Sequence, residues 1–89
     1  MLFMVVERFK PGRVSEVYAR FRERGRMLPG ELEYVSSWVD VERTCCFQLM
    51  ETGDHGLLDK WMENWKDLID FEVFPVISSA EMQRVMTEM

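Results

Sequence analysis

The spacing of hydrophobic residues along the chain predicts four strands and two helices in the order strand, helix, strand, strand, helix, strand. Residues 2–9 and 44–51 carry apolar side chains on both faces of an extended chain, which is typical of strands covered on both sides. Apolar residues recur at helical spacing in residues 14–28 and again in residues 57–68. These two stretches are therefore expected to be helices that pack on a common core.

Residues 31–41 and 69–77 have the features of outer strands. The first stretch carries serine on both faces, and its alternation places Tyr34 and Trp38 on the same side. The second stretch contains Pro75, which has no N–H to donate to a neighbouring strand. Both stretches are therefore expected at the edges of the sheet.

This order of elements predicts one α+β domain of ferredoxin-like βαββαβ topology over the whole chain, residues 1–89. The sheet should be antiparallel, with the first and third strands in the centre and both helices on one face. After the fourth strand, a capping box from Ser78 to Glu81 predicts a short terminal helix. That helix would carry the apolar residues Met82, Val85, Met86 and Met89.

Two helices cover only one face of such a sheet, so the other face is expected to stay exposed. Side chains such as Phe3 or Met4, and Phe47 or Met50, would form an apolar patch on it. An exposed apolar patch of this size predicts an association surface. We expect a second copy of the chain to cover it and form a homodimer, with a bound ligand as the other way to cover it.

The distribution of charge disfavours a nucleic-acid partner. The chain has a net charge of −5, whereas affinity for a duplex depends on neutralising phosphates. RNA-recognition modules share the same strand order, but residues 43–49 have one aromatic residue and no glycine for stacking bases. The basic residues of the first helix favour a solvated face that pairs with acidic neighbours, with docking of an anion or acidic partner as the alternative. These residues are Arg13, Arg20, Arg22, Arg24 and Arg26.

A membrane partner is not expected either. No stretch approaches the roughly 20 apolar residues that a spanning helix needs. Residues 1–6 are apolar but too short for a signal peptide, and two charged residues follow at once. We therefore expect a cytoplasmic location.

Cys45 and Cys46 are the only cysteines, and they are adjacent in a predicted strand. Neighbouring strand residues point to opposite faces, so the two thiols should stay apart and reduced. The chain has no CxxC motif and no histidine at a suitable spacing, which excludes a structural zinc site of the usual kind. We expect no metal and no cofactor.

Six stretches of the sequence together resemble known proteins: residues 1–10, 20–29, 32–40, 46–51, 58–61 and 70–73. These stretches cover nearly the whole chain, and they resemble a family of short bacterial proteins of unknown function that looks like a branch of the dimeric α/β-barrel superfamily. The resemblance implies two ferredoxin-like sheets packed face to face as a homodimer. Relatives in the wider superfamily include cofactor-free monooxygenases of aromatic compounds, haem-degrading enzymes, lactone isomerases and ligand-sensing regulatory domains. No catalytic residue is transferred from them, because a shared fold does not imply a shared reaction.

His55 is the only histidine, so any mechanism that needs an imidazole acid or base, or a haem ligand, must use it. It follows Asp54 at the expected start of the second helix. Histidines at a helix start are more often surface residues than catalytic ones. His55 is therefore a weak catalytic candidate, and haem degradation depends on it alone.

An aromatic cluster is the candidate ligand-binding site. Trp61 and Trp65 are one helical turn apart, and Tyr34 and Trp38 lie on a neighbouring strand. Aromatic walls with a few polar groups suit a flat apolar ligand, although such stripes are more often plain core. Among the carboxylates in the strands or at their ends, Glu51 and Glu72 are the first to consider as buried proton carriers.

Two functions of different classes follow. The first is a homodimer that binds an apolar or aromatic small molecule between sheet and helices, with cofactor-free oxygenation or isomerisation as its enzymatic version. The second is a structural or regulatory dimerisation domain without catalysis. A cavity beside the tryptophans would distinguish the first from the second.

Overall fold

The computed structural model describes residues 1–88, and Met89, with its expected place in the terminal helix, lies outside the described residues. The predicted order of elements is confirmed, and the strand bounds differ from prediction by two residues at most. The elements are β1 (Leu2–Phe9), α1 (Val14–Arg24), β2 (Glu33–Val39), β3 (Cys45–Glu51), α2 (Gly56–Met62), β4 (Ile69–Val76) and α3 (Ser79–Glu88).

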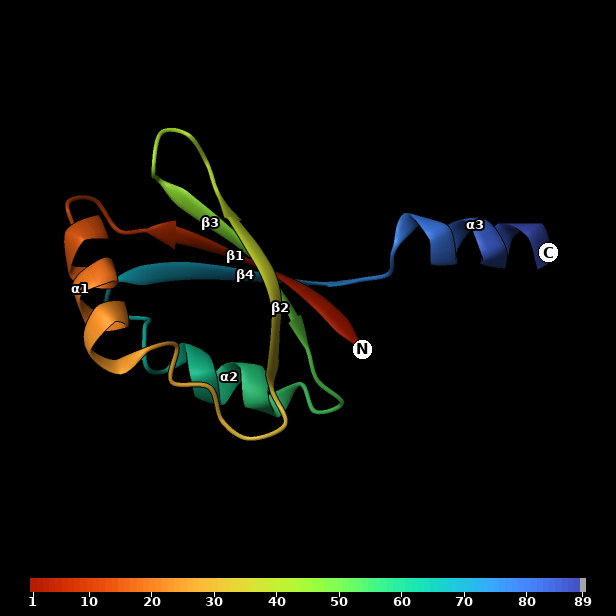
Figure 1. Cartoon of the computed structure of the whole chain (residues 1–89), viewed down its shortest axis with the longest axis horizontal. Helices are drawn as coiled ribbons and strands as arrows, with labels where there is room; N and C mark the ends of the chain where they lie inside the picture. The colour runs from red at the N-terminus through yellow and green to blue at the C-terminus, as the bar shows by residue number, and fades with distance from the viewer. Residues whose placement is uncertain (89) are drawn as a thin grey trace.

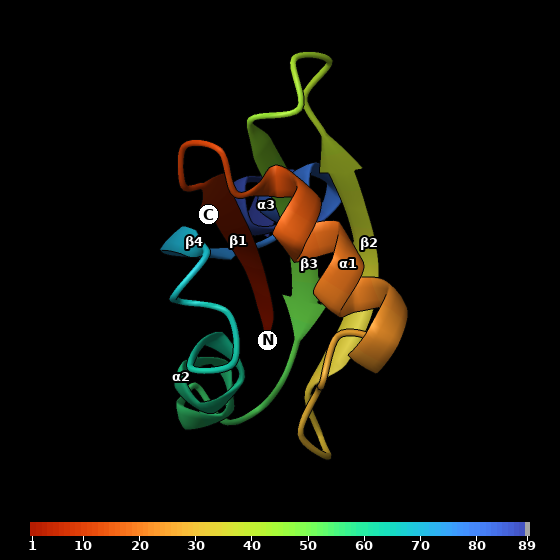
Figure 2. The ribbon, with the colours of Figure 1, turned by 90° about the vertical axis from the view of Figure 1, so that its left-hand side faces the viewer.

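The four strands form one antiparallel sheet in the order β2-β3-β1-β4. As predicted, β1 and β3 are central, and Pro75 lies in an edge strand. Helices α1 and α2 lie on the same side of the sheet (Figure 1), and α1 runs across it in front of β3 (Figure 2). The buried core lies between them and the sheet, as the ferredoxin-like fold requires.

Alternation along the central strands assigns each side chain to one of two faces. Phe3, Val5 and Glu7 of β1 point to the face that carries the helices, where they are buried. Met4 and Phe47 lie on the opposite face, here called the open face. Of the alternatives considered above, Met4 and Phe47 are therefore the residues available for association, whereas Phe3 and Met50 belong to the core.

The expectation that Tyr34 and Trp38 share one side is wrong. The register of β2 against β3 shifts between Tyr34 and Ser36, and an extra residue in a strand inverts the alternation beyond it. Tyr34 is paired with Met50 on the helix-bearing face, whereas Trp38 is paired with Phe47 on the open face. Trp38 is 55% exposed there.

Helix α2 is shorter than its apolar pattern predicts. It ends at Met62, and a series of turns carries Trp65 and Leu68 into the core before β4 begins. At its start, Asp54 Oδ1 accepts a hydrogen bond from the Gly56 N–H at 2.9 Å. Asp54 thus satisfies a free backbone N–H of α2, although the N-cap residue of the helix is His55.

Helix α3 projects from the end of β4, away from the rest of the molecule (Figure 1). Ser78 Oγ accepts a hydrogen bond from the Glu81 N–H at 3.0 Å, as the capping box predicts. None of its described residues is buried, and Met82, Val85 and Met86 are exposed. Across residues 1–88, no helix combines the length and hydrophobicity needed to cross a bilayer.

Candidate functional site

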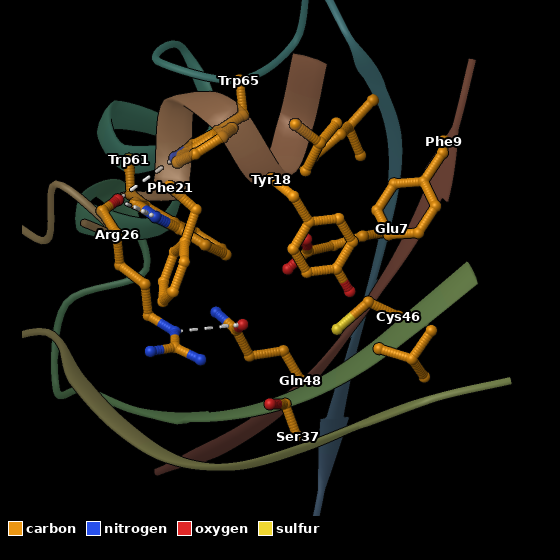
Figure 3. A pocket seen from close by; sticks show the side chains of 13 residues that line it. Glu7, Phe9, Tyr18, Phe21, Arg26, Ser37, Cys46, Gln48, Trp61 and Trp65 are labelled. Carbon is orange, nitrogen blue, oxygen red and sulfur yellow. Dashed lines mark hydrogen bonds between the residues drawn. The ribbon is translucent and has the colours of Figure 1, made fainter. Parts of the chain in front are cut away.

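A cavity of about 160 Å³ lies between the helix-bearing face of the sheet, α1 and the segment that contains Trp61 and Trp65 (Figure 3). Its walls are mainly aromatic and aliphatic, and charged or amide side chains reach it from β1, β3 and the segment after α1. The lining residues are Glu7, Phe9, Val17, Tyr18, Phe21, Arg26, Ser37, Val39, Cys46, Gln48, Trp61, Trp65 and Ile69.

The two tryptophans hold one wall of the cavity in place. The indole N–H groups of Trp61 and Trp65 both donate to the main-chain oxygen of Arg26, at 3.0 Å and 3.1 Å. A carbonyl oxygen has two lone pairs and can accept both bonds. Met27, which follows, has a positive φ of 59°. These two bonds therefore fix the sharply turned segment after α1 against the segment around α2.

The side chain of Arg26 lies among aromatic rings. Its guanidinium carbon is 3.6 Å from the centre of the Tyr34 ring and 5.0 Å from that of Phe21. A cation over an aromatic face is attracted by the ring quadrupole. Arg26 Nε also donates to Gln48 Oε1 over a long 3.4 Å. These contacts place a positive charge beside the cavity.

Glu7 is the one acidic side chain that lines the cavity. It is 7% exposed, and within residues 1–88 no protein group donates a hydrogen bond to its Oε2 atom. Burial raises the pKa of Glu7 from 4.5 to about 7, against the opposing effect of the positive charge of Arg26. A carboxyl group with this pKa exchanges its proton near neutral pH, as an acid or base catalyst must.

The two cysteines point to opposite faces of β3 and are unpaired, as predicted. Cys46 lines the cavity, and Cys45 lies on the open face. Burial, followed by the nearby Glu7, raises the pKa of Cys46 to about 12. Its thiol therefore stays protonated and is a poor nucleophile at neutral pH.

The structure brings together some of the aromatic residues predicted to bind a ligand, and it separates others. Trp61 and Trp65 line the cavity. Tyr34 is not a lining residue, but its ring packs against the guanidinium group of Arg26, which is one. Trp38 lies on the other side of the sheet. His55 is exposed at the start of α2, with its ring edge-on to Phe3 at 5.3 Å, and is outside the cavity wall.

The carboxylates that the sequence placed first are also outside the cavity. Glu51 accepts a hydrogen bond from the N-terminal ammonium group at 2.6 Å, and Glu72 forms an ion pair with Arg8 on the open face. Glu7 is the carboxylate that lines the cavity instead, and no motif in the sequence marks it. The available signal was an acidic residue on the otherwise apolar face that Val5 and Phe9 share in a central strand.

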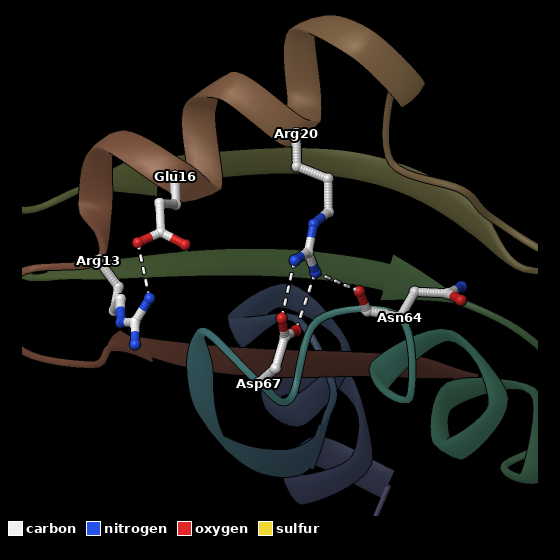
Figure 4. Close-up of polar contacts among 5 residues, drawn as sticks. All are labelled: Arg13, Glu16, Arg20, Asn64 and Asp67. Carbon is white, nitrogen blue, oxygen red and sulfur yellow. Dashed lines mark hydrogen bonds and ion pairs between the residues drawn. The ribbon is translucent and has the colours of Figure 1, made fainter.

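Arg20 and Arg13 of the basic row pair with acidic neighbours (Figure 4). Arg20 donates two hydrogen bonds to Asp67, at 2.7 Å and 2.8 Å, and one to the Asn64 main-chain oxygen at 2.8 Å. The bond from Arg20 lowers the pKa of Asp67 to about 2. Arg13 pairs with Glu16 at 2.7 Å. These two arginines thus behave as the solvated face expected from the sequence.

No cluster of three or more histidine, cysteine or acidic side chains with the geometry of a metal site occurs among the residues described. In comparisons with known proteins, residues 1–89 match the family described as "Domain of unknown function (DUF3303)". Neither a curated protein nor a solved structure gave a significant match.

Proposed function

We propose that this chain, which belongs to the DUF3303 family, binds a small apolar or aromatic molecule in the cavity between its sheet and helices. One observation carries the proposal: a cavity of about 160 Å³ has walls of Trp61 and Trp65 and a single buried carboxyl group, Glu7. Ligand sites are mostly apolar concavities with a few convergent polar groups and perturbed pKa values.

The proposal includes a homodimer that forms through the open face. Trp38, Phe47 and Phe74 are each more than a third exposed on that face. Monomeric proteins rarely leave aromatic side chains of adjacent strands uncovered together. A second copy packed on this face would bury them while leaving the cavity, on the opposite side of the sheet, unobstructed. The unpaired thiols fit the cytoplasmic location that we also propose.

If the protein is an enzyme, the cavity supports proton transfer, as in an isomerisation or the activation of a substrate for cofactor-free oxygenation. Glu7 replaces His55 as the acid–base candidate, because Glu7 lines the cavity and His55 does not. Substitution of His55 by alanine should then leave both binding and turnover unchanged.

The three tryptophans give a direct test of ligand binding. In a ¹H–¹⁵N NMR spectrum, each indole N–H gives its own signal, assigned from single Trp→Phe variants. Toluene, which is apolar and has one ring, is added to the protein. We expect the signals of Trp61 and Trp65 to shift until saturation, while that of Trp38 stays in place because it lies on the open face.

Two adjacent serines provide matched variants for this titration. Ser37 lines the cavity, whereas Ser36 is paired with Leu49 on the open face. Ser37→Leu should fill part of the cavity and weaken toluene binding, and Ser36→Leu should not. Absence of saturable shifts at Trp61 and Trp65, or equal shifts at all three tryptophans, would contradict the proposed cavity site.

The alternative function is a structural or regulatory dimerisation domain. The exposed aromatic residues of the open face and the unpacked helix α3 favour it. A protein that dimerises but gives no saturable toluene shift would support this alternative.

A further inference from the structure

The size of the cavity suits a ligand of about one ring. Its volume is about 160 Å³. An engineered apolar cavity of about 150 Å³ in another protein stays dry and binds benzene. Aromatic rings of Phe9, Tyr18 and the two tryptophans line the cavity, and such walls suit a flat molecule of that size.

The polar group of the ligand is indicated by Glu7. Buried side-chain oxygens almost always have a hydrogen-bond partner, and an unpaired one costs about 1–3 kcal/mol. Glu7 Oε2 has no protein donor within residues 1–88, although it is buried in the cavity wall. A ligand that places a donor against the Glu7 carboxyl group in the cavity wall removes that cost when it binds.

The charges around the cavity favour a neutral donor. Arg26 is positive and acts electrostatically on Glu7, so a cationic amine entering beside Glu7 would be repelled by Arg26. An anion such as a carboxylate would be attracted by Arg26 and repelled by ionised Glu7. A hydroxyl group avoids both penalties, because it donates to Glu7 without carrying charge.

We propose that the cavity takes a neutral one-ring molecule with a hydroxyl group, and that this hydroxyl donates its hydrogen bond to Glu7. The inference rests on the cavity site proposed above and adds the chemical class of its ligand. When the hydroxyl ionises, its proton bonds to a carboxylate oxygen of Glu7 and the O–H electron pair stays on the ligand oxygen. Arg26 then stabilises the oxygen anion, and the carboxyl group is left neutral.

The test compares p-cresol with toluene, which has the same ring and methyl group but no hydroxyl. Both are titrated into the protein at pH 8, where p-cresol is neutral, with the indole signals of Trp61 and Trp65 as the readout. We expect p-cresol to bind about tenfold more tightly than toluene, since a hydrogen bond to a charged group exceeds the cost of burying the hydroxyl.

Glu7→Leu is the decisive variant. It replaces the carboxyl group with an apolar side chain of similar size and so removes the cost of the unpaired buried oxygen. The variant should keep its affinity for toluene and should bind p-cresol no more tightly than toluene. Retention of the tenfold preference in Glu7→Leu would overturn the assignment of the hydroxyl to Glu7.

The pH provides a second readout. The groups that face Glu7 are Tyr18 from α1, Cys46 from β3 and Arg26, while β4 places Phe71 opposite it. Unlike these neighbours, Glu7 is expected to change its charge between pH 6 and pH 8. The preference for p-cresol should therefore be smaller at pH 6 than at pH 8, and Glu7→Gln should abolish this difference. A difference that persists in Glu7→Gln would contradict the proposal.

Other probes separate the failure of this inference from that of the proposed function. Tighter binding of benzylamine or benzoate than of p-cresol would overturn the neutral class but leave the cavity as a ligand site. Equal binding of toluene and p-cresol would show that Glu7 does not recognise the hydroxyl group, and the cavity would still be a ligand site. If none of the four molecules shifts Trp61 and Trp65, both proposals fail.

Discussion

At the scale of single residues, Glu7 is a carboxyl group buried in the middle of an apolar strand without a protein hydrogen-bond donor among the described residues. Its neighbours on the same face, Val5 and Phe9, belong to the core or pack against it. Replacing Glu7 with an apolar residue would satisfy the hydrophobic pattern better. A position that opposes local packing in this way is where a functional constraint is expected.

The burial of Glu7 predicts that stability falls as pH rises. Its pKa is about 7 in the folded protein, against 4.5 ordinarily, so the folded chain holds a proton that the unfolded chain releases. Between pH 4.5 and pH 7 the free energy of unfolding should decrease by about 3 kcal/mol from this group, and above pH 7 its effect is constant. Urea unfolding at fixed protein concentration measures this slope.

Glu7→Gln should remove most of that slope, because the amide does not titrate. Glu63→Gln is the control, since Glu63 is exposed and pairs only with Lys66, three residues away. Equal slopes in the wild type and Glu7→Gln would show that Glu7 does not retain its proton in the folded state.

At the scale of elements, α1 is tied to the turn before β4 by Arg20 and Asp67. Both side chains are partly exposed, so solvent screening limits the pair to about 0.5–1 kcal/mol. A double-mutant cycle with Arg20→Met and Asp67→Asn, followed by urea unfolding, should give a coupling energy of this size at neutral pH.

The coupling between Arg20 and Asp67 should also depend on pH. The pKa of Asp67 is lowered to about 2, so its contribution is present above pH 4 and lost as pH falls through 2. A coupling energy that is unchanged at pH 2, or one that increases with added salt, would contradict the ion pair.

The spacing of hydrophobic residues predicts the order of elements well, because each spacing pattern extends over a whole strand or helix. These patterns fail where a single residue changes the geometry. The irregularity between Tyr34 and Ser36 moves Trp38 to the open face, and nothing in the local sequence specifies that extra residue. Helix α2 ends at Met62 although the apolar pattern continues beyond it. The turns after α2 also place Trp65 in the core, so the pattern alone does not show where the helix ends.

The cavity is harder to predict than the fold because tertiary contacts create it. Trp61 and Trp65 both lie in its wall, and their spacing, which places them on one face, is a signal for this that the sequence carries. The contact of both indoles with the Arg26 main chain joins residues far apart in sequence, and periodicity carries no signal for it. Glu7 was missed because a lone carboxylate in a strand has no motif.

At the scale of the whole molecule, the open face predicts the oligomeric state. Phe47 lies on β3, between Trp38 on one side and Val6 on the other. Phe47→Glu would place a charge in the middle of the proposed interface, where an unpaired buried charge costs several kcal/mol. We expect this variant to remain folded and become monomeric.

Native mass spectrometry of the freshly purified protein measures the oligomeric state directly. Val41→Glu is the control, because Val41 is 97% exposed in the turn between β2 and β3 and the substitution is chemically similar. The wild type and Val41→Glu should be dimers. A monomeric wild type would contradict the homodimer without affecting the cavity.

The central claim is that a small one-ring hydroxyl compound binds beside Glu7. A crystal structure of the protein with p-bromophenol tests it most directly, because the anomalous signal of bromine locates the ring without ambiguity. We expect one bromine site in the cavity walled by Trp61 and Trp65, with the ligand oxygen about 2.5–3.0 Å from a Glu7 carboxyl oxygen. A bromine site confined to the open face, or a ligand oxygen turned away from Glu7, would contradict it.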